Sequence, residues 1–166
     1  MAETTIWRGR SSQWKNLGPY VLYAVLAGAV VGIMAIIGQV ATLEIRKVIP
    51  FTLLVLVVPI FMALSRYLQT KSKTYELTNE RLKITEGVFS KTTDTLELYR
   101  VKDLETRQPF LYRMVRVENV QLNTSDSSSP SVFIEAVPSA VMLADKIRNE
   151  VEAIRALKGV REIDVE

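Results

Sequence analysis

The sequence predicts an α+β protein in which a hairpin of two transmembrane helices precedes a curved antiparallel sheet, or open barrel, capped by a C-terminal α-helix. Three observations predict this architecture: two long uncharged apolar runs come first, alternating strand patterns follow, and one amphipathic helical stripe comes last. We expect a cytoplasmic N-terminal segment over residues 1–16, the hairpin over 17–66, the β-rich domain over 71–159 and a tail over 160–166.

The two apolar runs are each long enough to cross a bilayer. No charged residue lies between Leu17 and Leu43 or between Val48 and Ser65, and about 20 apolar residues span a hydrocarbon core of about 30 Å as a helix. Only residues 44–47 separate the runs, so we expect an antiparallel hairpin with both termini on one side. The first run is too long for the apolar core of a signal peptide, which has about 7–15 residues.

Basic and aromatic residues indicate the orientation of this hairpin. Lys and Arg gather at its outer ends, whereas the turn holds only Arg46 and Lys47. Cytoplasmic flanks are the richer in Lys and Arg, so we expect both termini in the cytoplasm and the chain in the inner cell membrane. The outer basic residues are Arg8, Arg10, Lys15, Arg66, Lys71 and Lys73, and the aromatic residues expected in the headgroup layer are Trp7, Trp14, Tyr20, Tyr23 and Tyr67.

Small residues form a stripe on the first run. Ala24, Gly28 and Gly32 recur every fourth residue, and such a stripe lets a second helix approach closely. It could seat the second helix of the same hairpin, or it could drive self-association. The sequence leaves both interpretations open.

The composition excludes several classes of function. The chain has no Cys and no His, so it lacks thiolate nucleophiles and the commonest zinc ligands. We therefore expect no metal site, no cofactor and no enzyme activity. Of the formal charge of +3, residues 1–70 hold +4, from six basic and two acidic residues, and the remainder holds −1. Because the basic excess lies beside the apolar runs, nucleic acid is disfavoured as a partner and no small-molecule substrate is indicated.

The remaining chain reads as strands followed by a helix. Alternating residues predict a hairpin over 74–78 and 82–86, strands over 92–98 and 101–107, a helical turn over 110–114, and a strand pair over 117–124 and 132–136 that a polar loop joins. Ser139 is the expected N-cap of the last helix, which Gly159 ends. Its apolar stripe comprises Leu143, Ile147, Val151, Ile154 and Leu157. Val and Ile beyond Gly159 could add a short strand.

Three segments carry a resemblance to a known family. They are IWRG at residues 6–9, YELTNERL at 75–82 and ELYRVKD at 97–103. With the two-helix hairpin, they make the chain similar to bacterial pleckstrin-homology-like membrane proteins of the YdbS-like group. The resemblance implies a pleckstrin-homology-like (PH-like) domain anchored by the hairpin. The chain departs from the group after residues 111–113, where VRVE at 115–118 lacks the glycines that typically lead into the next strand.

The preferred function is a membrane-anchored interaction or assembly module that associates with itself or with other membrane proteins, because no catalytic constellation is present. The first alternative is a domain that binds anionic lipid. The outer basic residues named above would do so together with Arg81, Lys83 and Lys91, although the negative charges of neighbouring glutamates balance theirs. The second is a homo-oligomeric pore, although the runs offer few polar groups to line one.

One polar cluster is the remaining candidate for catalysis. Tyr99, Arg100, Lys102 and Asp103 are close in sequence. On a strand, Tyr99 would share a face with Val101, and Arg100 with Lys102. Mixed polar faces of this kind are usually structural, so we assign no catalytic role to the cluster.

Overall fold

The computed structural model describes residues 3–40, 44–126 and 129–158. The chain divides into two compact units: a helical unit, Asn16–Leu68, and a β-rich unit, Met1–Lys15 with Gln69–Glu166. The expected ends of the first run at Leu43 and of the last helix at Gly159, the tail 160–166 and the possible strand within it lie outside the described residues.

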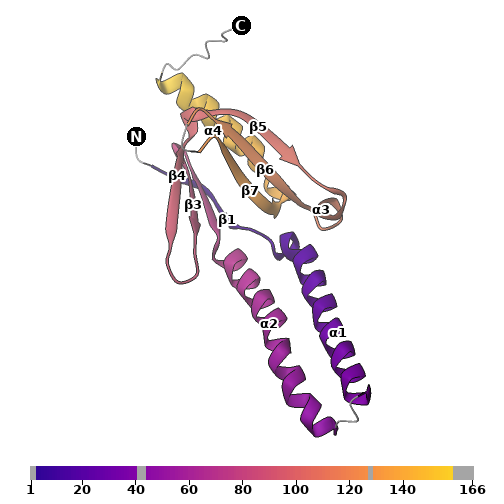
Figure 1. Cartoon of the computed structure of the whole chain (residues 1–166). Coiled ribbons are helices and arrows are strands. Elements are labelled where there is room, and N and C mark those ends of the chain that lie inside the picture. The colour runs from indigo at the N-terminus through magenta and orange to yellow at the C-terminus, as the bar shows by residue number, and fades with distance from the viewer. Residues whose placement is uncertain (1–2, 41–43, 127–128, 159–166) are drawn as a thin grey trace. The chain divides into compact units, whose positions relative to one another are not determined.

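The helical unit consists of two long helices, α1 (Leu17–Val40) and most of α2 (Ile45–Ser72) (Figure 1). Both are long and apolar enough to cross a membrane, and only 6% of the most apolar window of each is buried. The helix α2 begins before the expected Val48 and continues past Ser65, because its flanking Arg, Lys and Leu residues favour helix. The helices approach closely at Gly38, where an added Cβ would lie 3.1 Å from Cγ2 of Val48.

The first sheet of the β-rich unit has the strand order β1-β2-β3-β4, and all its neighbours are antiparallel. Its strands are β1 (Thr5–Arg10), β2 (Thr74–Thr78), β3 (Arg81–Glu86) and β4 (Thr92–Glu97). The Thr78 hydroxyl accepts a hydrogen bond from the Arg81 N–H at 2.9 Å, which closes the β2–β3 turn. The strand β1 was not predicted, and it brings the N-terminal segment into this sheet.

The second sheet has the order β5-β6-β7, with β5 (Val101–Arg107), β6 (Val117–Thr124) and β7 (Ser131–Pro138). The 3-10 turn η2 (Leu98–Arg100) carries the chain from β4 into β5, and the short helix α3 (Phe110–Met114) joins β5 to β6. No described residue of β4 pairs with β5, so the two sheets form an open arrangement and not a closed barrel.

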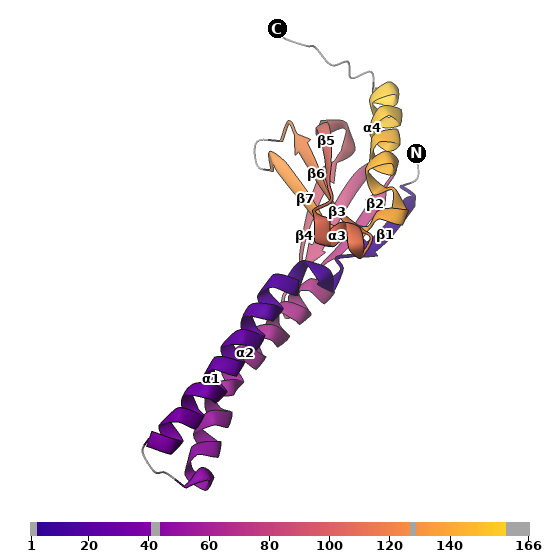
Figure 2. The same ribbon diagram turned by 90° about the vertical axis from the view of Figure 1, so that its right-hand side faces the viewer.

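The helix α4 (Leu143–Lys158) closes the core of this open arrangement (Figure 2). Its residues Leu143, Ile147, Val151 and Ile154 are buried together with Tyr75, Leu98 and other side chains of both sheets. The Tyr75 side chain is 0% exposed, and its hydroxyl group is satisfied by the Ser11 hydroxyl at 3.1 Å and the Glu135 N–H at 3.2 Å. Burial of these four residues agrees with the predicted stripe, whereas its fifth member, Leu157, is 67% exposed because it lies in the last turn of α4, beyond the core.

The start of the last helix differs from the prediction. Ser139 begins a separate 3-10 turn, η3 (Ser139–Val141), and its hydroxyl donates to the Arg116 carbonyl at 3.1 Å instead of capping a helix. Met142 then adopts a left-handed conformation with φ of 49°, which interrupts the helical backbone before Leu143. The Ser139 hydroxyl therefore bonds a residue distant in sequence and does not cap the helix.

The segment without the family's glycines still makes a left-handed turn. Arg116, between α3 and β6, has φ of 54°, a conformation that glycine adopts far more easily than other residues. Its carbonyl oxygen accepts the Ser139 N–H at 2.9 Å. A turn is therefore present in this segment although the chain has no glycine there.

Candidate functional site

The outer edge of β5 is the most suggestive feature of the β-rich unit. Among the described strands, β5 pairs only with β6. Side chains bond two of its backbone groups in place of a second strand: Arg155 Nη2 donates to the Val101 carbonyl at 2.6 Å, and the Leu104 N–H donates to Asp103 Oδ1 at 2.8 Å. Unpaired strand edges accept added strands readily, and natural proteins often cover them with side chains or helices.

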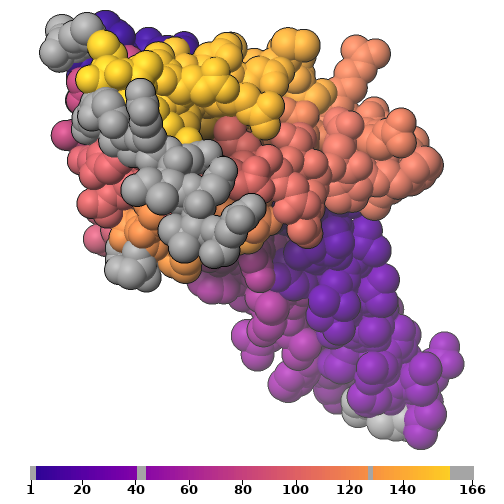
Figure 3. Space-filling model, turned by 90° about the horizontal axis from the view of Figure 1, so that it is seen from above, coloured from indigo at the N-terminus to yellow at the C-terminus, as the bar shows by residue number. Residues whose placement is uncertain are grey.

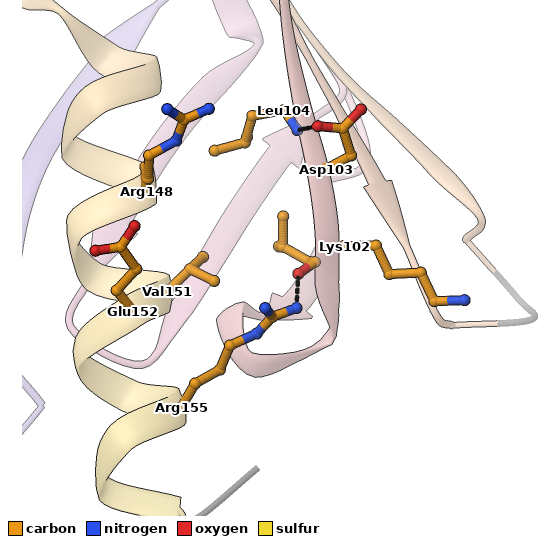
Figure 4. A pocket seen from close by; sticks show the side chains of 8 residues that line it. Lys102, Asp103, Leu104, Arg148, Val151, Glu152 and Arg155 are labelled. Atoms are coloured by element: carbon orange, nitrogen blue, oxygen red, sulfur yellow. Dashed lines mark hydrogen bonds between the residues drawn. The ribbon is translucent and has the colours of Figure 1, made fainter. Parts of the chain in front are cut away.

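A shallow cavity of about 130 Å³ lies beside this edge, between β5 and α4. We call it the β5–α4 groove, and it is lined by Val101, Lys102, Asp103, Leu104, Arg148, Val151, Glu152 and Arg155. Figure 4 shows Leu104 and Val151 pointing toward one another, while Arg148, Glu152 and Arg155 reach out from α4. Figure 3 shows α4, in yellow, running along the surface of the β-rich unit.

The groove has an apolar floor with charged sides. Val101 and Val151 are buried, whereas Lys102, Asp103, Arg148 and Glu152 are exposed. Three basic and two acidic side chains line it, so it carries a small positive excess. Such a surface can hold an extended polypeptide by backbone hydrogen bonds and seat one small apolar side chain on the floor.

The strand β4 also lies at an edge of its sheet, as do β1 and β7. Its residues Thr92, Thr93, Asp94 and Thr95 are all exposed, and among the described strands β4 pairs only with β3. A polar edge without an apolar floor gives an added strand little side-chain burial. The edge of β5, beside which the groove lies, is therefore a better candidate for a binding site than the edge of β4.

The structure pairs many of the predicted lipid-binding residues with carboxylates. Lys15 lies 2.8 Å from Glu135, Lys73 lies 3.2 Å from Glu86, Lys83 lies 2.9 Å from Glu3, and Arg8 lies 3.8 Å from Glu76. Arg66 and Lys71 are exposed in the last part of α2 and Arg10 is exposed at the end of β1, whereas Arg81 is the first residue of β3, at the other end of the first sheet. The predicted set thus forms no single basic patch.

Glu76 lies between two of these basic residues on the first sheet. It is the cross-strand partner of Arg8 in β1 and of Lys83 in β3. An acidic residue between two basic ones reduces the attraction of this strip for an anionic surface.

The two glycines of the small-residue stripe on α1 do not pack against α2. An added Cβ at Gly28 or at Gly32 would meet no atom within 4 Å, and Ala24 is exposed. The close approach of the two helices occurs at Gly38 instead. Of the two interpretations of the stripe, seating the second helix of the same hairpin is therefore wrong for this structure, and self-association stays a prediction.

The predicted interface aromatics occupy different environments. Trp7 packs against the core of the β-rich unit, and its ring lies over Gly9, where an added Cβ would meet Trp7 Cζ2. Trp14 is 48% exposed in the 3-10 turn η1 (Gln13–Asn16), directly before α1. Tyr20 and Tyr67 lie near the outer ends of α1 and α2. Trp7 thus has a structural contact that the sequence did not indicate.

The polar cluster near Tyr99 is a turn and not a continuous strand. Tyr99 and Arg100 belong to η2, so the predicted alternation with Val101 and Lys102 is wrong there. Arg100 Nε donates to the Tyr99 hydroxyl at 3.2 Å and Nη1 lies 2.9 Å from Asp126, and the pKa of Arg100 is raised by these partners, with Tyr99 the larger influence. Within the described residues, no group of three or more His, Cys, Asp or Glu side chains could hold a metal ion.

Sequence reasoning missed the α4 side of the groove. Arg148, Glu152 and Arg155 follow at intervals of four and three residues, which places them on one face of α4 beside the buried stripe. That spacing was visible in the sequence. What was missing was the pairing of this face with β5, which lies about 50 residues earlier in the chain.

A known protein family matches most of the chain. A family model described as "Bacterial PH domain" matches residues 19–156, which include most of α1, all of α2 and most of the β-rich unit. No curated protein matches the chain. Among solved structures, a DUF1696-family protein with a pleckstrin-homology domain from Shewanella loihica PV-4 is similar, with 13% identity, a TM-score of 0.41 and coverage of 50% of this chain and 74% of that one. The chain belongs to the bacterial PH domain family.

Proposed function

We propose that this protein is a membrane-anchored, non-enzymatic interaction module whose β5–α4 groove binds an extended polypeptide segment by strand addition. The observation that carries the proposal is the open edge of β5, where the side chains of Asp103 and Arg155 occupy backbone groups that a neighbouring strand would otherwise bond. A fold alone does not assign a function; the open edge of β5 and the groove beside it support this one.

The two long helices support the anchoring. With only 6% of each apolar window buried, nearly all of this surface would contact water in the absence of a bilayer. No charged residue lies within Leu17–Val40 or between Val48 and Ser65. A two-helix hairpin satisfies its backbone hydrogen bonds internally, as a membrane span must.

Backbone geometry identifies the donors available to an added strand. The Leu104 N–H bonds a side chain and not β6, and alternate residues of an antiparallel edge strand direct their N–H groups the same way. No register shift occurs between Asp103 and Arg107, so the Thr106 N–H also points away from β6. Thr106 has an exposed side chain, which makes it a suitable position for a test.

The test uses the full chain in lipid nanodiscs and a displayed library of random 12-residue peptides. We expect enrichment of peptides with alternating apolar residues, and we expect Thr106→Pro to abolish their binding because it removes one outward N–H without removing a β5–β6 hydrogen bond. The matched variant Thr106→Val keeps the N–H and should keep the binding. A lack of enrichment above empty nanodiscs, or binders that tolerate Thr106→Pro, would contradict the proposal.

A second candidate function is self-assembly through α1. It is favoured by the open space at Gly28 and Gly32, which α2 of the same chain does not fill. A pore is the weaker version of this candidate, because the Thr52 hydroxyl already donates to the Val48 carbonyl at 2.9 Å and the spans hold no charged residue to line a channel. Lipid recognition is also weaker, because carboxylates pair with several of the basic residues.

A further inference from the structure

The chain enters and leaves the β-rich unit with almost no linker. The turn η1 continues directly into α1 at Leu17, and only Lys73 separates the end of α2 from β2. If the two helices span a membrane, as proposed above, the bilayer surface must lie within a few residues of Lys15 and Lys73, since consecutive Cα atoms are about 3.8 Å apart. We call this end of the β-rich unit, formed by residues 11–15 and 69–73, the connector end.

Short contacts tie both sheets to the connector end. Glu135 of β7 lies 2.8 Å from Lys15 and 4.0 Å from Lys73, and Lys73 lies 3.2 Å from Glu86, the last residue of β3. The Ser12 N–H donates to the Ala136 carbonyl at 2.8 Å. The end of β3 and the second half of β7 therefore lie at the connector end.

Exposed apolar side chains project from two segments of the β-rich unit. The β3–β4 turn follows Glu86 directly, and within it Phe89 is 102% exposed. The second segment is α3, where Phe110 is 75%, Leu111 56% and Met114 69% exposed. Isolated apolar residues on a surface are ordinary, but four of the larger ones on two short segments are more than scattered single exposures and call for a partner surface.

The register of the second sheet places α3 at the same end. Val117, which follows α3, pairs with Pro138 of β7, three residues after Glu135. The pKa of Tyr112 in α3 is raised, first by burial and then by the negative charge of Glu135. Figure 1 shows the β3–β4 turn and α3 at the end of the β-rich unit where β2 starts.

The β3–β4 turn has a backbone conformation that requires glycine at its first position. Gly87 has φ of 117°, which other residues rarely adopt, and a Cβ there would meet the Ser90 carbonyl oxygen. Within this turn the Phe89 side chain points into solvent. The exposed Lys91 follows Phe89, and the exposed Arg113 lies within α3.

We propose that Phe89 and the apolar side chains of α3 insert into the interfacial layer of the bilayer that holds α1 and α2. This inference rests on the membrane anchoring in the proposed function. A bilayer fits better than a protein partner, because both connectors leave the β-rich unit from this end and exposed cations lie beside the apolar groups, an arrangement that suits an anionic headgroup layer. The β-rich unit would then be held against the membrane at four places, by its two connectors, the β3–β4 turn and α3.

The absence of Cys allows a direct test by spin labelling of single-Cys variants. The full chain would be reconstituted in nanodiscs that contain anionic lipid and labelled at Phe89→Cys or Met114→Cys. The matched control is Leu157→Cys, because Leu157 is also apolar and 67% exposed but lies near the far end of α4. Collision rates with oxygen, which concentrates in lipid, and with a water-soluble nickel complex would be measured at each label.

We expect the ratio of oxygen to nickel collisions to be at least several-fold higher at positions 89 and 114 than at 157. Equal ratios at the three positions would overturn the inference, and so would labels at 89 and 114 that neither reagent reaches, since that would indicate protein cover. Labels at Val31→Cys in α1 and Val57→Cys in α2 separate the two claims. If the labels at 31 and 57 contact lipid but the label at 89 contacts water, insertion is refuted and the membrane anchor stands. If the labels at 31 and 57 contact water, the membrane anchor is refuted as well.

Discussion

The ammonium group of Lys15 lies 2.8 Å from a carboxylate oxygen of Glu135. This contact joins the turn before α1 to β7, across 120 residues of sequence. The Lys15 side chain is 20% exposed and that of Glu135 is 41% exposed, so the pair is only partly shielded from water. The ion pair holds the segment before α1 against β7.

A double-mutant cycle measures this contact. For Lys15→Ala and Glu135→Ala, we expect a coupling free energy of about 0.5–1 kcal/mol, as for other partly exposed ion pairs. The unfolding of the β-rich unit would be followed by near-ultraviolet circular dichroism in detergent, at low salt. Zero coupling would show that Glu135 is held by Lys73 or by solvent and not by Lys15.

The left-handed turn at Arg116 predicts an unusual gain in stability. Arg116→Gly should leave the β-rich unit as stable or up to about 1 kcal/mol more stable, because relief of the left-handed backbone offsets the greater freedom of glycine in the unfolded chain. Arg113→Gly, in the neighbouring helix α3, is the matched control and should destabilise by about 1 kcal/mol. The midpoint of chemical unfolding reports both values. Equal destabilisation by the two variants would contradict this account of the turn.

Glu118 makes the stability depend on pH. Its pKa is raised above 4.5, first by burial and then by the negative charge of Asp145. Near and below pH 4.5 the folded state retains this proton, and as the pH rises through the folded-state pKa the native chain must ionise a half-buried carboxyl group, so stability falls. Glu118→Gln should remove that loss. Hydrogen exchange of the β6 and β7 amides from pH 4 to 7 should show a difference between variant and parent that widens with pH, whereas a constant difference would exclude this role.

The open stripe on α1 predicts self-association. Gly28→Leu should convert an oligomer to monomers, because a larger side chain prevents close helix contact and meets nothing within the same chain. Gly18→Leu is the matched control, since Gly18 also faces open space but lies off the stripe. Native mass spectrometry from nanodiscs gives the mass of each. A monomeric parent, or an oligomer that survives Gly28→Leu, would rule out assembly through this stripe.

Much of the fold could be predicted because its signals are local. The alternation of apolar and polar residues from Thr74 to Glu86 is a strand signal within one hairpin, and the apolar residues of α4 repeat at helical spacing. Composition and length alone single out both long helices.

The features that sequence analysis missed depend on distant contacts. The strand β1 is short, holds two Arg and one Gly, and gains its pairing from β2, almost 70 residues later. Ser139 has a good capping side chain, yet the Arg116 carbonyl takes its hydroxyl. The β5–α4 groove needs α4 to lie beside a strand about 50 residues away, and its polar residues resemble an ordinary solvated helix face until the two elements are seen together.

The central claim, a hairpin anchor that holds the β-rich unit on the cytoplasmic side, is tested most directly by labelling single cysteines in bacterial cells. The sites are Glu44→Cys, in the short turn before α2, and Leu157→Cys, in α4. With a membrane-impermeant maleimide, we predict that position 44 reacts in intact cells and that position 157 reacts only after the inner membrane is opened. Reaction of both sites in intact cells, or of both only after opening, would contradict the two-span anchor.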